Sequence, residues 1–232
     1  MPNVHFIKNN IKVNWAGYSL VQALVNGFTE ILGSGISYGY INILSGQDYP
    51  IKSTREIHRF FNENPGKAFM HTLRIEDEWQ EAIPRLTKYH LADLNFPGKY
   101  SIERLMNTML PKRKLPGPLI PVGRSSWFTL SPAFAKYIVD YLTEHPAFVR
   151  FFKLSWGSDE IVFQTILYNS PFKKDMVNDN LLYVDWSEGR PNPKILTIAD
   201  AEALRTSNKL FARKFNPAID SNILDYLDSI AS

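Results

Sequence analysis

The chain of 232 residues carries 26 basic and 23 acidic residues, and 44% of its residues are hydrophobic. This composition is typical of one globular domain, which we expect to span residues 1–232. The near-balanced charge excludes a nucleic-acid-binding module with a dominant basic face. The absence of cysteine excludes disulfides, thiolate metal sites and cysteine nucleophiles. Every apolar run is shorter than the ~20 residues of a membrane-spanning helix.

The first part of the chain predicts alternating strands and helices. In chain order we expect extended segments at 4–7 and 11–15, a helix at 19–32 ended by Gly33 and Gly35, and a strand at 38–44. A turn at 45–50, a helix begun by the capping-box residues Ser53 and Glu56, and a strand at 69–71 follow. This order is typical of an α/β sheet, in which ligands gather beyond strand ends, so the turn at 45–50 is a candidate ligand-facing loop.

The second part begins with a charged, partly helical stretch at 75–109. Residues 111–121 hold four prolines and a glycine, which predict a connector or lid arm without regular structure, and we interpret its basic run 112–114 as a solvated loop. We then expect a strand at 126–130, a helix from Pro132 to Thr143, a helix at 159–168, a strand at 182–186, a loop at 187–193 and a terminal helix at 219–230.

Two adjacent carboxylates, Asp159 and Glu160, follow Ser158 at the start of an apolar segment. Helix capping explains this pattern, because Ser and Asp cap helices and acidic residues favour the first turn. A general base explains it as well, provided that the carboxylate lies in a partly apolar cleft that raises its pKa. Taken alone, these residues favour capping.

Adjacent cations, Arg213 and Lys214, lie between two phenylalanines in the segment 210–215 (LFARKF). Cations that packed aromatic rings hold in place can neutralise a diphosphate without a metal ion. The alternative is a surface patch in which the aliphatic stems cover apolar neighbours. This segment alone favours the surface patch.

The sequence gives little support for a metal site. Its five histidines are scattered without ligand spacing, and no Asp-x-Asp motif occurs. The nearest acidic run, residues 76–78 (EDE), is better explained as a solvated acidic turn. We therefore expect no metal ion and no other cofactor.

Five segments occur in the order found in one enzyme family, that of the core-2/I-branching β-1,6-N-acetylglucosaminyltransferases and protein O-xylosyltransferases, which the chain resembles over residues 13–216. The segments are 44–52 (LSGQDYPIK), 123–130 (GRSSWFTL), 158–160 (SDE), 183–186 (YVDW) and 210–215 (LFARKF). Residues 169–181 also look like the xylosyltransferase branch. Five ordered matches are more specific than any one of them.

The resemblance implies an α/β fold, a GT-A-like sandwich in its metal-independent form, and transfer from a UDP-sugar with inversion. It places the catalytic glutamate at Glu160. The cations that hold the UDP diphosphate fall on Arg213 and Lys214, with Arg190 or Lys194 as a further contact. The implied sugar- or acceptor-binding residues are Trp186, Asp48, Ser126 and Trp127, of which Asp48 is expected in a structural or a substrate-contacting role.

Two departures from the family pattern matter. Xylosyltransferases carry an acid at the position of Ser126, which leaves N-acetylglucosamine or another sugar open as donor beside xylose. Family members also begin with a strand and helix that help to hold the uracil, and this chain starts within the following segment. We therefore expect the donor-binding scaffold to be N-terminally incomplete.

Two functions follow from this pattern. The first is an inverting transferase that moves N-acetylglucosamine or xylose from a UDP-sugar to a glycan or glycolipid hydroxyl. The alternative is a non-catalytic or degenerate glycan-binding protein of the same fold. The family's Golgi members are anchored and disulfide-bonded, so the absence of cysteine leads us to expect a bacterial, cytoplasmic protein, with peripheral binding at the inner membrane left open.

Overall fold

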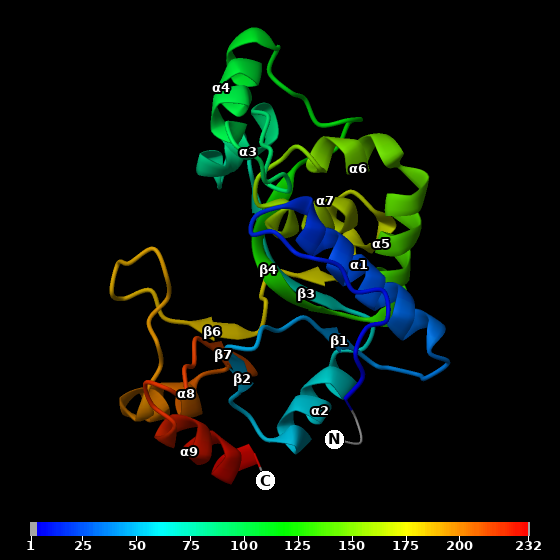
Figure 1. Cartoon of the computed structure of the whole chain (residues 1–232). Helices are drawn as coiled ribbons and strands as arrows, with labels where there is room; N and C mark the ends of the chain where they lie inside the picture. Colours follow the sequence, from blue (N-terminus) through cyan, green and yellow to red (C-terminus); the bar gives the residue numbers. More distant parts are fainter. Residues whose placement is uncertain (1–3, 232) are drawn as a thin grey trace.

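The computed structural model describes residues 4–231, which form two small mixed sheets and the helices around them (Figure 1). The larger sheet has the strand order β1 (Ile41–Asn42), β4 (Val122–Leu130), β3 (Ala68–Arg74), β5 (Met176–Val177). The smaller sheet has the order β2 (Asp48–Pro50), β7 (Phe211–Arg213), β6 (Leu182–Val184). The larger sheet has two antiparallel pairs and one parallel pair, and the smaller sheet has one of each. The predicted α/β class is confirmed, and the arrangement is consistent with a GT-A-like fold.

Four helices lie together beside the larger sheet (Figure 1): α1 (Tyr18–Gly33), α5 (Pro132–Glu144), α6 (Pro146–Phe152) and α7 (Val162–Tyr168). Their apolar faces and the sheet form the main hydrophobic core. Phe28, Phe128 and Phe163 meet there with ring centroids 5.2 to 6.5 Å apart. Burial of such large aromatic side chains makes the strongest apolar contribution to stability and fixes β4 against α7.

The smaller sheet has its own apolar cluster, with α8 (Ala201–Thr206) and α9 (Asn222–Ala231). A third cluster, to which Phe69 of β3 and Phe211 of β7 belong, has Trp127 of β4 packed against it and joins the two sheets. Helix α2 (Thr54–Glu63) packs against the same cluster through Phe60 and Phe61. The two sheets are therefore linked by apolar contacts as well as by the chain.

Two helices stand at the end of the molecule opposite α8 and α9 (Figure 1): α3 (Ile83–Thr87) and α4 (Lys99–Met109). Residues 110–121 return from this end to β4 and contain neither helix nor strand, as predicted. Within residues 4–231, no helix is both long and apolar enough to cross a membrane.

Several local predictions are confirmed. Ser53 and Glu56 form the predicted capping box of α2, and Pro132 occupies the first turn of α5. The acidic run 76–78 is a surface turn, in which Asp77 pairs with the exposed Arg74 at 3.0 Å. These patterns depend on residues within one turn of each other, so the local sequence is sufficient to specify them.

Three predictions are wrong. The strand expected at 38–44 forms only at Ile41–Asn42, because it is an edge strand that pairs with two residues of β4. The helix expected at 159–168 is divided: Ser158–Glu160 form a 3₁₀ turn, and α7 begins at Val162, because Ile161 leaves helical geometry. The basic run 112–114 is not wholly solvated, because Arg113 is buried.

Arg113 ties the predicted connector to α6. Its guanidinium lies 4.0 Å from the ring centroid of Phe151 and donates to the carbonyl oxygens of Phe151, Leu154 and Lys88. Burial lowers the pKa of Arg113 to about 10, which leaves it cationic at neutral pH. The start of the segment 111–121 is therefore fixed, and a lid function for the rest stays a prediction.

Candidate active site

Glu160 lies at the end of the 3₁₀ turn Ser158–Glu160, which packs closely on β4. A Cβ atom at Gly123 would lie 2.2 Å from the carbonyl oxygen of Glu160, so the strand approaches the turn only because residue 123 is glycine. Gly157 precedes the turn with φ +65°, and a Cβ there would lie 2.8 Å from the guanidinium of Arg85. Two glycines thus make room for the carboxylate and its partner.

Arg85, on α3, donates through Nη1 to Oε2 of Glu160 in an ion pair. Its guanidinium carbon lies 4.7 Å from the ring centroid of Trp79 and 4.5 Å from that of Trp156. The cation is therefore held between two indole rings, each of which attracts it. This arrangement fixes where the Glu160 carboxylate points.

Burial is the largest influence on the Glu160 carboxylate and raises its pKa above the ordinary value for glutamate. The Arg85 cation lowers the pKa of Glu160, and the neighbouring Asp159 raises it again, with a net shift upward. One third of the side chain stays exposed, at 33%. The carboxylate is thus reachable from solvent and a stronger base than a surface glutamate.

Asp159 is buried, and its carboxylate accepts a hydrogen bond from Oγ of Ser126 on β4. Burial raises the pKa of Asp159, while the Ser126 hydrogen bond acts in the opposite direction. Ser158 does not cap a helix, because its hydroxyl donates to the carbonyl oxygen of Phe152 at 2.8 Å. The capping explanation of residues 158–160 is therefore wrong in this structure.

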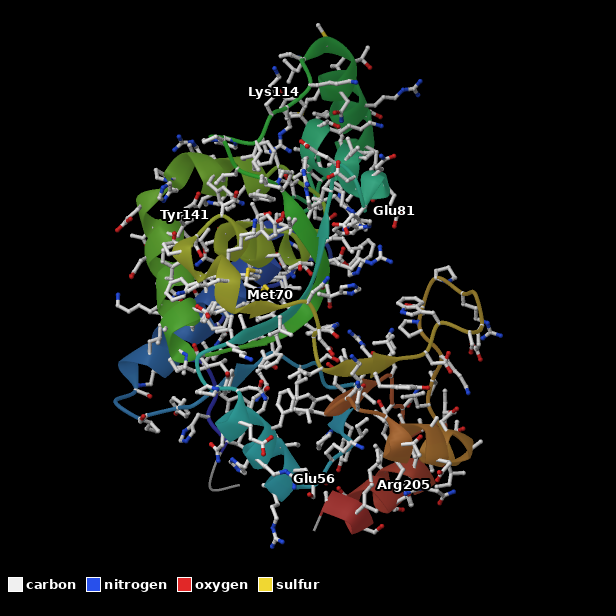
Figure 2. The ribbon with its side chains drawn as sticks, turned by 180° about the vertical axis from the view of Figure 1, so that it is seen from behind. Glu56, Met70, Glu81, Lys114, Tyr141 and Arg205 are labelled. Carbon is white, nitrogen blue, oxygen red and sulfur yellow. The ribbon has the colours of Figure 1, made fainter. Side chains whose placement is uncertain are left out.

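A second polar network extends from the Arg85 side of the site. Glu81 pairs with Arg124 at 3.1 Å and accepts from the indole nitrogen of Trp79 at 3.0 Å. Figure 2 shows Glu81 at the base of the end that carries α3 and α4. The Arg124 charge also lowers the pKa of Glu160, as the smallest of the influences on it.

Asp48 lies in β2, and its side chain is fully buried. Its carboxylate accepts from the backbone N–H of Ser45 at 2.7 Å and from the Ser45 hydroxyl at 2.8 Å. Opposite it in the antiparallel pair lies Arg213, whose Nε is 3.3 Å from Oδ1 of Asp48. This geometry supports the structural role for Asp48, which fixes both the turn at 45–50 and the Arg213 side chain.

Arg213 stacks over Trp127, with its guanidinium carbon 4.7 Å from the ring centroid. Burial lowers the pKa of Arg213, and the Asp48 carboxylate opposes that effect. Lys214 follows through a cis peptide bond, and its ammonium group has one contact among the described residues, with the Asn192 side chain at 3.4 Å. Of the two cations, Lys214 is the more accessible to a ligand.

β4 connects the two groups of site residues. Ser126 contacts Asp159, beside Glu160, and the next residue, Trp127, stacks on Arg213. Between Arg124 and Phe128 the pairing of β4 with β3 is irregular, with three residues of β4 opposite one residue of β3. The bulged stretch 125–127 thus carries contacts to both groups of site residues.

The remaining predicted residues lie on or near the loop after β6. Trp186 is largely exposed, and Arg190 pairs with Glu188 at 3.5 Å on the same loop. Lys194 pairs with Asp200 at 2.6 Å, and its carbonyl oxygen accepts from the backbone N–H of Lys214. The backbone of Lys194 thus lies next to that of Lys214, and the choice between Arg190 and Lys194 as a diphosphate contact stays open.

The sequence model of the Core-2/I-Branching enzyme family matches residues 1–207 of the chain. The chain belongs to the Core-2/I-Branching enzyme family. The resemblance seen in the five ordered segments is thereby confirmed, and the protein is a member of a glycosyltransferase family.

Xylosyltransferases of this family are similar to the chain. Xylosyltransferase 2 of Rattus norvegicus is 25% identical over 92% of this chain and 26% of its own length. Xylosyltransferase oxt of Drosophila melanogaster is 25% identical over 98% of this chain and 27% of its own length. The xylosyltransferase of Ciona intestinalis is 23% identical over 98% of this chain and 28% of its own length. The chain thus spans about a quarter of the length of these animal relatives. A bacterial source and a cytoplasmic location stay predictions.

For this Core-2/I-Branching family member, sequence reasoning missed the partners of Glu160. Arg85 and Trp79 lie far from Glu160 along the chain, and no local pattern marks them. Trp156 directly precedes Gly157 and Ser158, and an aromatic residue next to a candidate base was a usable signal. The exposed ring of Trp15 contacts Trp156 edge-on, with centroids 5.2 Å apart.

Proposed function

We propose that this chain is an inverting glycosyltransferase in which Glu160 is the general base and the donor is a UDP-sugar. The observation that carries the proposal is the state of Glu160: a carboxylate with a raised pKa, accessible and held by Arg85. A base whose pKa is raised toward neutral pH accepts a proton from a sugar hydroxyl more readily than an ordinary glutamate.

In the proposed reaction the acceptor hydroxyl oxygen attacks the anomeric carbon from the side opposite the diphosphate. The new carbon–oxygen bond forms, the bond from the anomeric carbon to the phosphate oxygen breaks, and UDP leaves with the electron pair. The acceptor proton passes to Glu160. A single displacement inverts the anomeric centre, so one base suffices, and positioned bases accelerate reactions by about 10²–10⁴-fold.

Charge that develops on the departing diphosphate requires cations nearby. Lys214 is available for this role, and Arg213, fixed by Asp48 and Trp127, adds positive potential beside it. Lys194 lies beside Lys214 through a backbone hydrogen bond, and its ammonium group is paired with Asp200. In this proposal the lysine and arginine side chains take the place of a metal ion, since fixed charges in a partly desolvated site stabilise such a leaving group.

The donor sugar is proposed as xylose or N-acetylglucosamine, and the acceptor as a glycan or glycolipid hydroxyl. The relatives named as xylosyltransferases support xylose. Ser126 argues for a different sugar, because a serine stands where the xylosyltransferase pattern has an acid, and its hydroxyl is bonded to Asp159.

The test is transfer by the intact chain with UDP-xylose and UDP-N-acetylglucosamine as donors and a panel of glycan acceptors. Glu160→Gln is expected to reduce kcat by about 10²-fold or more, while Glu144→Gln, an exposed glutamate at the end of α5, leaves it unchanged. EDTA should have no effect, and the product should have the inverted anomeric configuration. Full activity of the Glu160 variant contradicts the assignment of the base.

The second candidate is a glycan-binding protein of the same fold without transfer activity. It is favoured by one observation: Arg213 already has Asp48 and Trp127 as partners and is largely buried. Calorimetry with UDP separates the two functions. Absence of UDP binding by the folded chain, together with binding of glycans, favours the second candidate.

A further inference from the structure

Helix α4 exposes an apolar stripe to solvent. Ile102, Leu105 and Met109 are spaced i, i+3 and i+7, which places them on one face of the helix. They are 45%, 56% and 74% exposed. No residue of α4 is buried, so this helix contributes little to the core. Side chains of this size in contact with water indicate that the face meets something outside the chain.

More apolar side chains surround the stripe at the same end of the molecule. The exposed ones nearest to it in sequence are Leu94, Phe96, Tyr100 and Leu110. A pocket of about 270 Å³ also lies between α3, α4 and residues 110–112, and Lys88 and Lys112 are among the residues that line it. Leu110 belongs to both, so the apolar surface adjoins a pocket that two lysines help to line.

The charges at this end are strongly unequal. Lys88, Arg104, Lys112 and Lys114 are exposed, and none of them forms an ion pair with any residue from 4 to 231. Figure 2 shows Lys114 beside α4 in this outlying part.

The nearby acids are already engaged. Asp93 accepts from the backbone N–H of Ser19, and Glu103 accepts from the backbone N–H of Leu91 at 2.9 Å. Neither carboxylate forms an ion pair with the four cations, and residues 83–114 hold seven lysine and arginine residues against these two acids, so the net potential at this end is positive.

We propose that α4, with the flanking residues 94–100 and 110–114, docks on the surface of a bilayer that contains anionic lipids. Apolar side chains on an amphipathic helix enter the boundary between headgroups and acyl chains, and basic residues around them contact the anionic headgroups. Each cation near an anionic leaflet strengthens binding by about fivefold, which corresponds to about 1 kcal/mol. The proposal is independent of the transferase function.

The charge distribution selects a lipid surface over a second copy of the chain. A symmetric dimer through α4 would bring the same unpaired cations together from both subunits, and like charges repel. The position of the helix agrees with docking on a flat surface, because α3 and α4 form one end of the molecule, opposite α8 and α9 (Figure 1).

The test uses the full chain with vesicles of phosphatidylcholine alone and of phosphatidylcholine mixed with phosphatidylglycerol. The chain has no cysteine, so Met109→Cys carries an environment-sensitive dye at a single site. We expect flotation with the mixed vesicles, a blue shift of the dye, and loss of both as salt concentration rises. Ile219→Cys, 59% exposed near α9, is the matched control and should show no shift.

Two variants separate the apolar and the ionic contributions. Leu105→Glu with Met109→Glu should weaken vesicle binding by about tenfold or more, and Arg104→Glu with Lys112→Glu should do the same while thermal stability is retained. Equal binding of the unsubstituted chain to vesicles of phosphatidylcholine alone and to the mixed vesicles overturns the proposal. So does an α4-dependent dimer in light scattering without vesicle binding, which would assign the face to a second copy.

Discussion

Arg85 and Glu160 form an ion pair in which the cation is itself held between the rings of Trp79 and Trp156. The pair meets two requirements of the general base that we propose Glu160 to be. Burial raises the pKa of the Glu160 carboxylate, and the fixed guanidinium sets its direction. In the proposed function Arg85 is a positioning residue, which acts through Glu160.

The first prediction concerns the pH dependence of transfer by Arg85 variants. As the proposed general base, Glu160 must be deprotonated to accept a proton, so we expect kcat/KM to rise with pH through the pKa of Glu160, which lies above its ordinary value. Arg85 lowers this pKa, so Arg85→Gln raises it further and moves the acid limb of the profile to higher pH. Arg85→Lys keeps the charge and should move the limb less.

Arg124→Gln is the matched control for this experiment. The Arg124 charge also lowers the pKa of Glu160, but it is the smallest influence on that pKa. The acid limb of the Arg124→Gln profile should therefore move less than that of the Arg85→Gln profile. Circular dichroism checks that each variant is folded. An acid limb in Arg85→Gln that coincides with the wild-type limb rules out the positioning role.

The second prediction concerns Asp48. Asp48→Asn keeps the shape of the side chain but leaves the largely buried Arg213 cation without its partner. Removal of one member of a buried pair costs about 3 kcal/mol, which urea unfolding measures as a lower midpoint. Asp77→Asn breaks an exposed pair with Arg74 and should cost less than about 1 kcal/mol. Equal losses in the two variants contradict the structural role of Asp48.

Sequence patterns predicted features that depend on neighbouring residues, such as the Ser53–Glu56 capping box. They also marked Glu160, Arg213 and Lys214, but only as an ordered set, since each segment alone had a simpler explanation. The partner of Glu160 was not predictable, because Arg85 is 75 residues away and reaches it through the packing of α3. A side-chain pair of this kind depends on tertiary structure.

The basic run 112–114 is a second case in which tertiary structure decides the position of a side chain and the local pattern does not. Three adjacent cations before a proline-rich segment indicate solvated side chains, and for Arg113 this is wrong. The carbonyl oxygens of Phe151 and Leu154, at and just beyond the end of α6, accept backbone hydrogen bonds from Leu154 and His90, and the Arg113 guanidinium adds a further donor to each. This contact arises only once the two segments are folded together.

The third prediction follows from that contact. Arg113→Met keeps a long apolar stem against Phe151 but removes the guanidinium's hydrogen bonds to three carbonyl oxygens. The carbonyl oxygens of Phe151 and Leu154 keep their backbone donors, whereas that of Lys88 loses the Arg113 donor. We expect the free energy of unfolding to fall by about 2–4 kcal/mol. Lys112→Met, at the exposed neighbour, should change it by less than about 0.5 kcal/mol. A loss as small in Arg113→Met as in the control shows that the contact contributes nothing to stability.

The fourth prediction concerns Trp15 and rests on the proposed transferase function. Its indole ring is 82% exposed and contacts Trp156 edge-on, and Trp156 in turn holds Arg85 against Glu160. An exposed aromatic face next to the base is suited to bind the apolar face of an acceptor sugar. Trp15→Ala should therefore raise the acceptor KM by about fivefold or more and leave the KM of the UDP-sugar unchanged.

Phe6→Ala is the control for Trp15, because Phe6 is more exposed still, at 91%, and makes no aromatic contact within residues 4–231. Initial rates over a range of acceptor concentrations at saturating donor measure the effect. If Trp15 instead serves to keep Trp156 and Arg85 in place, the variant lowers kcat and moves the acid limb of the pH profile without a change in acceptor KM. The two readouts distinguish an acceptor contact from a purely structural one, because only the first depends on acceptor concentration.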